Sequence, residues 1–109
     1  MRNPLQSVFN NQFAQIQENI TRAIEELDKT TLEGSAGGGA VKVQITGSGE
    51  VLSVQISPAA VAEDDIELLQ DLVCAAVRDA FHKALALKKE KLVGATPFGA
   101  LGMDLPNIF

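Results

Sequence analysis

Basic side chains cluster near the end of a predicted C-terminal helix. Four lysines fall within nine positions, and an arginine precedes them by one to two helical turns. Lysine and arginine bind phosphate oxygens, so this cluster could contact the backbone of a nucleic acid. The same lysines would also stabilise the negative end of the helix dipole, which is a purely structural role. The candidate phosphate-contacting residues are Arg22 on a first helix and Arg78, Lys83, Lys88, Lys89 and Lys91 on the last.

The overall charge limits what this cluster can bind. The chain of 109 residues has 14 acidic and 9 basic side chains, which gives a net charge of −5. A generic polybasic binder of nucleic acids or membranes is therefore disfavoured. Trp and Tyr, which commonly stack on bases, are absent from the sequence. Phosphate binding at the helix end would consequently be weak and sensitive to salt.

Other potentially reactive residues favour structural roles. The glycine run 37–39 leads into a strand and lacks the Gly-Lys-Ser/Thr ending of a P-loop. His82 has no nucleophile near it in sequence, which predicts a surface or interface imidazole. Cys74 lies among apolar residues, which predicts a buried thiol. Acidic residues at the start of the last helix suit its dipole and lack calcium-loop spacing. These acidic residues are Asp64, Asp65, Glu67 and Asp71. No catalysis, metal, cofactor or small-molecule substrate is predicted.

The elements that would position the basic cluster begin with a helix over residues 5–29. Its apolar residues recur at alternating spacings of four and three, which is typical of a heptad seam. Such a seam packs either inside its own chain or against a second copy, and this helix alone favours neither. The seam consists of Phe9, Phe13, Ile16, Ile20, Ala23 and Leu27.

A small antiparallel sheet and a long helix are predicted next. Residues 41–46 and 52–56 alternate apolar and polar side chains around a Gly-rich turn, and a weaker third strand is expected within 30–36. Pro58 ends the last strand, and a helix follows from the acidic residues to about Leu92. The predicted fold class is α+β, in the order α-β-β-β-α. Its domain comprises residues 1–93, followed by a mobile tail of Gly, Pro, Leu and Phe over 94–109.

The two helices carry more apolar surface than one small sheet can cover. A last helix of roughly 29 residues would be about 43 Å long, whereas a compact domain of this size is about 34 Å across. Leaving these side chains in water would forgo about 1.5–3 kcal/mol each, so an intertwined symmetric homodimer is predicted. A tight fold-back of a single chain is the alternative. The predicted dimer contacts are Phe9, Phe13, Ile16, Ile20, Ala76 and Ala80.

Four segments together resemble the YbaB/EbfC nucleoid-associated family. They cover residues 34–43, 47–49, 54–58 and 65–76, and the heptad helix and the apolar tail also match. The resemblance implies an α-β-β-β-α protomer, a homodimer with projecting helices, and a non-enzymatic DNA-binding role in the bacterial nucleoid or a plastid. The first helix departs from the family pattern because it is rich in Gln and Asn rather than Lys and Met. This departure moves the predicted DNA contacts toward the last helix.

The function predicted from the sequence is therefore a dimeric DNA-binding protein that contacts mainly phosphate and reads few bases. A protein-interaction module without DNA affinity is the alternative, based on the acidic net charge and the apolar tail. No apolar run approaches the roughly 20 residues that cross a bilayer, and no signal peptide is visible. A cytosolic protein without a membrane partner is expected.

Overall fold

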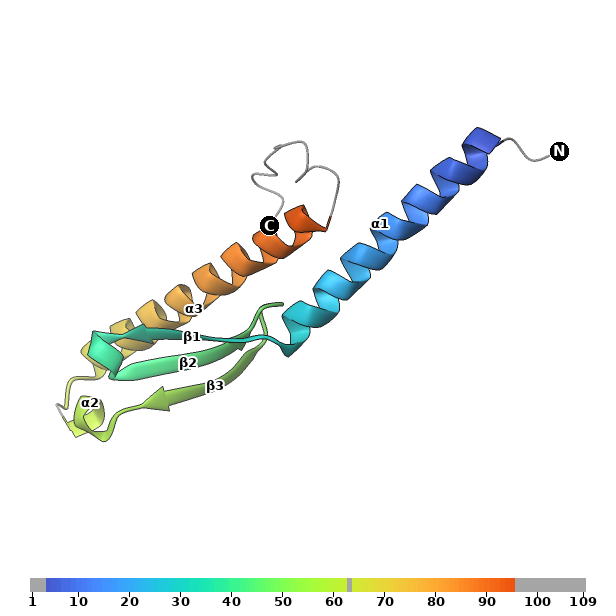
Figure 1. Ribbon diagram of the computed structural model, residues 1–109. Helices are drawn as coiled ribbons and strands as arrows, with labels where there is room; N and C mark the ends of the chain where they lie inside the picture. Colours follow the sequence, from blue (N-terminus) through green and yellow to red (C-terminus); the bar gives the residue numbers. More distant parts are fainter. Residues whose placement is uncertain (1–3, 63, 96–109) are drawn as a thin grey trace.

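The computed structural model describes residues 4–62 and 64–95, with side chains from Asn10 onward (Figure 1). The α+β order α-β-β-β-α is confirmed, with a short additional helix before the last one. The elements are α1 (Pro4–Lys29), β1 (Thr31–Ala36), the 3-10 turn η1 (Gly37–Gly39), β2 (Val41–Thr46), β3 (Val51–Ile56), α2 (Pro58–Ala62) and α3 (Ile66–Gly94).

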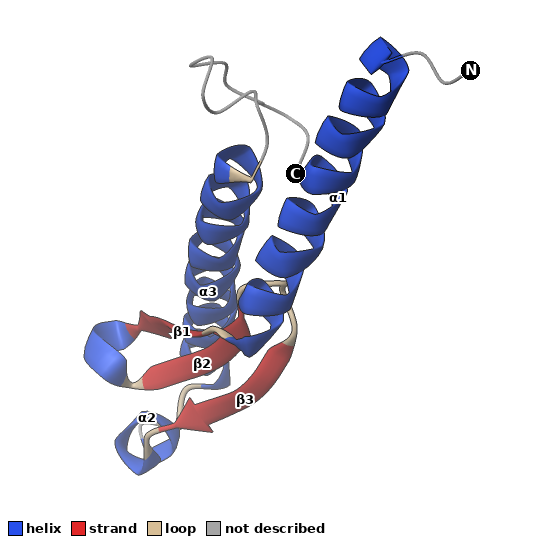
Figure 2. Ribbon diagram, turned by 45° about the vertical axis from the view of Figure 1, so that its right-hand side comes forward, coloured by secondary structure: helices blue, strands red, loops and turns tan. Residues whose placement is uncertain are grey.

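The three strands form one antiparallel sheet in the order β1-β2-β3, and α3 lies across one of its faces (Figure 2). Alternation along β2 explains this arrangement. Val41, Val43 and Ile45 are fully buried against α3, whereas Lys42 is exposed on the other face. The core consists of Val41, Val43, Ile45, Ala76, Ala80 and Ala84.

Gly34 of β1 allows the backbone of α3 to come unusually close. A Cβ atom at this position would lie 2.6 Å from the carbonyl oxygen of Ala76 and closer still to the amide nitrogen of Ala80. The small residues Ala76, Ala80 and Ala84 form a ridge on α3, and this alanine ridge therefore packs against a strand of its own chain. Ala76 and Ala80 have no exposed surface left. Within one chain these two residues are covered by its own sheet, and their predicted role as dimer contacts stays a prediction.

The chain breaks between the short helix α2, which begins at Pro58, and α3. Asp64 adopts a left-handed backbone conformation with φ 55°, which ends α2. The Asp65 carboxylate then accepts a hydrogen bond of 3.0 Å from the amide of Leu68 and caps α3. Of the acidic residues predicted at the start of the long helix, Asp65 caps it and Glu67 lies in its first turn.

The molecule is elongated because α1 extends well beyond the sheet (Figure 1). Its radius of gyration is 20.0 Å and it measures 76 × 23 × 16 Å. A compact domain of this length would have a radius near 13 Å. Only the C-terminal part of α1 is buried, through Ala23 and Leu27, while Phe13 is 56% exposed. The side chain of Phe9 and the predicted tail from Thr96 onward lie outside what the structure describes.

Candidate nucleic-acid interface

The outer face of α3, opposite the sheet, carries the basic side chains best placed for a large ligand. Arg78, His82 and Lys89 lie about 160–180° around the helix from the buried Ala80. Arg78 and His82 are exposed, and Lys89 is half-buried. His82 was predicted only as a surface or interface residue, although its spacing of four from Arg78 places both on one face. These three residues form what we call the outer basic face.

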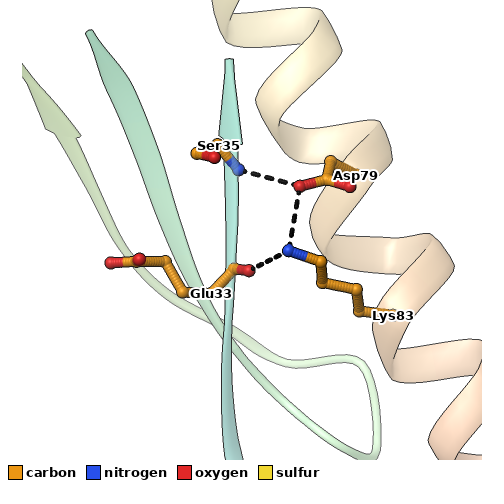
Figure 3. Close-up of polar contacts among 4 residues, drawn as sticks. All are labelled: Glu33, Ser35, Asp79 and Lys83. Atoms are coloured by element: carbon orange, nitrogen blue, oxygen red, sulfur yellow. Dashed lines mark hydrogen bonds and ion pairs between the residues drawn. The ribbon is translucent and has the colours of Figure 1, made fainter. Parts of the chain in front are cut away.

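Lys83, also predicted to contact DNA, instead joins α3 to the edge strand β1 (Figure 3). Its ammonium donates a hydrogen bond of 2.9 Å to the carbonyl oxygen of Glu33 and lies 3.2 Å from the Asp79 carboxylate. The backbone amide of Ser35 donates to the same carboxylate at 3.0 Å. Two outward-facing backbone groups of β1 are therefore satisfied by α3. The first role of Lys83 is structural.

The hydrogen bond from Ser35, and after it the contact with Lys83, hold the pKa of Asp79 below its ordinary value. A carboxylate with a lowered pKa stabilises the fold above its unfolded pKa, and this contribution is lost as the pH falls through the folded value. We therefore expect Asp79→Asn to lower the thermal midpoint at pH 7. The difference in thermal midpoint between Asp79→Asn and the parent protein should close at acidic pH, below about 4. Melting curves from circular dichroism at pH 7, 5, 4 and 3 measure this, with Asp71→Asn as the control. A gap that stays constant with pH would contradict the assignment.

The remaining predicted cations differ in how firmly their own chain holds them. Arg22 pairs with Glu18 one turn away at 3.2 Å, and both side chains are well exposed. Lys91 lies 3.3 Å from Glu26 and so links α3 to α1. Exposed pairs of this kind contribute little stability and open easily. Lys88 lines a shallow groove on the flank of α3. Lys88 lies beside the outer basic face. Lys91 lies about 20° around the helix from Ala80, on the opposite side of α3, and Arg22 belongs to α1.

Cys74 is exposed, which corrects the predicted buried thiol. It lies one turn before Arg78, whose guanidinium donates to its sulfur at 3.7 Å. The apolar neighbours of Cys74 in sequence point in other directions, because consecutive helical residues are 100° apart. The thiol is therefore open to reagents on the flank of α3.

A second feature is an apolar surface on β3 and the adjoining flank of α3. Val54 pairs with Val43 and Ile56 with Val41, so these side chains share the face that α3 covers elsewhere. They nevertheless remain 45% and 40% exposed, because the helix packs on β1 and β2. Phe81 and Leu85 line a groove of about 180 Å³ beside the β2–β3 turn. We call these four exposed residues the apolar flank: Val54, Ile56, Phe81 and Leu85.

Two kinds of feature are absent from the described residues. None of the helices in residues 4–62 and 64–95 combines the length and apolarity that a membrane crossing requires. Within the same ranges, His, Cys, Asp and Glu side chains nowhere gather in threes as metal ligands would.

Comparison with solved structures supports the fold. An uncharacterized protein from Helicobacter pylori superposes with a TM-score of 0.72, and the match covers 94% of this chain and 100% of that one. The two sequences are 22% identical, so this similarity concerns the fold alone.

Comparison of sequences identifies the family. Proteins named nucleoid-associated protein are similar over nearly the whole chain. The protein from Dictyoglomus turgidum is 40% identical over 97% of this chain and 96% of its own length. The protein from Streptomyces avermitilis is 44% identical over 89% of this chain and 85% of its own length. The family model described as the YbaB/EbfC DNA-binding family matches residues 4–99. With its helix, three antiparallel strands and long last helix, the chain belongs to the YbaB/EbfC DNA-binding family.

Proposed function

We propose that this chain is a nucleoid-associated protein that binds DNA as a homodimer in the bacterial cytoplasm, mainly through backbone phosphates. Family membership supports DNA as the ligand and a role without catalysis. The observation that carries the proposal is the outer basic face, which lies on a long helix and points away from the sheet. Phosphates of a duplex are accessible to such a convex surface without any pocket.

Arg78 and Lys89 would make the principal phosphate contacts. Lys88, Arg22, Lys83 and Lys91 would add charge after exchanging contacts within their own chain, such as those described above, for contacts with phosphate. Long flexible cations without a built recognition surface favour phosphate contacts over base contacts. We therefore expect similar affinity for duplexes of different sequence.

A second copy is the proposed partner of the apolar flank. Burying the exposed half of each of its side chains would gain on the order of 1 kcal/mol per side chain, and a two-fold axis doubles the number. β1 differs because its edge is held by Asp79 and Lys83, while the edge of β3 has no such cover among the described elements. A dimer formed in this way would carry two outer basic faces.

Phe81→Glu tests this interface. Placing a carboxylate in a buried apolar contact costs about 3 kcal/mol, so the dimer dissociation constant should rise at least about a hundredfold. Ala75→Glu is the matched control, since Ala75 is exposed on another side of the same helix. Light scattering across a concentration series gives the mass of each variant, and circular dichroism checks that both fold. If Phe81→Glu keeps the mass of the parent, the apolar flank is not the interface.

The function itself is tested by titrating the protein into a fluorescently labelled duplex at low salt. We expect saturable binding, of similar strength for unrelated duplexes. Absence of binding at the lowest salt would contradict the proposal and favour the alternative, a protein-interaction module without DNA affinity. Imaging a fluorescent fusion in bacterial cells would test the nucleoid location separately.

A further inference from the structure

The heptad seam of α1 is only partly covered by α3. Ala23 and Leu27 are buried where the two helices run side by side. Gly94 and Ala95, at the end of α3, line a cleft of about 440 Å³ together with Asn19 of α1. The two helices therefore separate near Asn19. Beyond this point α1 continues toward Pro4 without α3 beside it (Figure 1).

The uncovered part of the seam remains apolar. Ile20 and Ile16 are half-buried and Phe13 is 56% exposed, on the same side of the helix as Ala23 and Leu27. Between Pro4 and Gln17 the helix has no charged residue. This stretch therefore presents an apolar stripe bordered by amide side chains. It has no charged side chain that would disfavour contact with an apolar segment.

The chain leaves α3 where the seam loses its cover. Residues 96–109 contain a single charged side chain, that of Asp104, and several large apolar side chains. Those apolar side chains are Phe98, Leu101, Met103, Leu105, Ile108 and Phe109. Phe13 lies about 15 Å along the helix from Ala23, which about five extended residues can span. The tail is thus long enough and apolar enough to follow the seam.

We propose that residues 96–109 dock along the α1 seam of the same chain. They would cover the part of the seam, from Ile20 to Phe13, that α3 leaves exposed. A tethered segment acts at a millimolar effective concentration, so modest apolar contacts suffice to hold it. A second copy at cellular concentrations would instead lose its full translational and rotational freedom on association. This inference replaces the predicted dimer role of Phe13, Ile16 and Ile20 with an intrachain one, and it does not depend on DNA binding.

Disulfide trapping tests the docking. In a Cys74→Ser background, Gly102→Cys is combined with Gln12→Cys, which borders the seam, or with Ala14→Cys on the opposite side. Both helix positions are exposed, and neither substitution removes a seam residue. We expect the Gln12 pair to oxidise about tenfold faster, at the mass of one chain on a denaturing gel. Equal rates would overturn the proposal, and so would a band at twice the mass, which would assign the seam to a second copy.

A fluorescence measurement checks the same contact without cross-linking. Because the chain has no Trp, Phe98→Trp introduces a single reporter. We expect its emission to move to longer wavelength when Phe13→Asp is added and to stay in place with Ala14→Asp. Identical emission in all three proteins would show that the tail does not contact the seam.

Discussion

Arg78→Glu combined with Lys89→Glu is expected to weaken DNA binding at least about a hundredfold at physiological salt. Each phosphate contact contributes about 0.9 to the salt slope, and each reversal replaces an attraction by a repulsion. In the proposed dimer the double variant alters four positions. Fluorescence anisotropy with one duplex, at several salt concentrations, gives both the affinity and the slope.

The control for this variant is Lys42→Glu combined with Lys29→Glu. It makes the same change in net charge on exposed side chains that lie away from the outer basic face. We expect a much smaller loss, caused only by the change in the overall field. An equal loss in both proteins would mean that net charge, and not the outer basic face, governs binding.

Gly34→Ala is expected to have the largest effect on stability. The added Cβ would meet backbone atoms of Ala76 and Ala80, which cannot rotate away as a side chain could. Overpacking of a core usually costs about 1–3 kcal/mol, and a backbone clash belongs at or above the upper end. A loss of about 3 kcal/mol corresponds to a fall of about 12 °C or more in the thermal midpoint.

The matched control is Gly94→Ala. An added methyl group there meets no atom within 4 Å, and Gly94 has an ordinary helical backbone. We expect a small change or a slight stabilisation, because alanine restricts the unfolded chain. If the two variants have the same thermal midpoint in circular dichroism, the close approach of β1 and α3 does not require glycine at position 34.

The elements could be predicted because their signals are local. Alternation along β2 and the period of α1 are properties of consecutive residues, and both match the structure. The partner of the alanine ridge could not be predicted in this way. Small residues on a helix accept any close backbone, and the one that meets Ala76 and Ala80 comes from Gly34, far away in the sequence.

The candidate site shows the same limit. A lysine at a helix end could bind phosphate or its own chain, and only the position of Glu33 shows that Lys83 does the latter. Alternation in β3 predicted a half-buried strand, yet one helix about 10 Å wide covers only two strands spaced about 4.8 Å apart. Val54 and Ile56 are therefore left exposed. Which strands the helix covers depends on the tertiary arrangement and cannot be predicted from any single segment.

The salt dependence of DNA binding tests the central claim most directly. A dimer that neutralises about 4–8 phosphates should give a plot of log affinity against log salt with a slope between about −4 and −7. The measurement uses the full chain and one duplex, titrated from low to physiological salt. A slope in this range supports phosphate contacts by two outer basic faces. No binding at low salt, or an affinity that does not change with salt, would contradict the account.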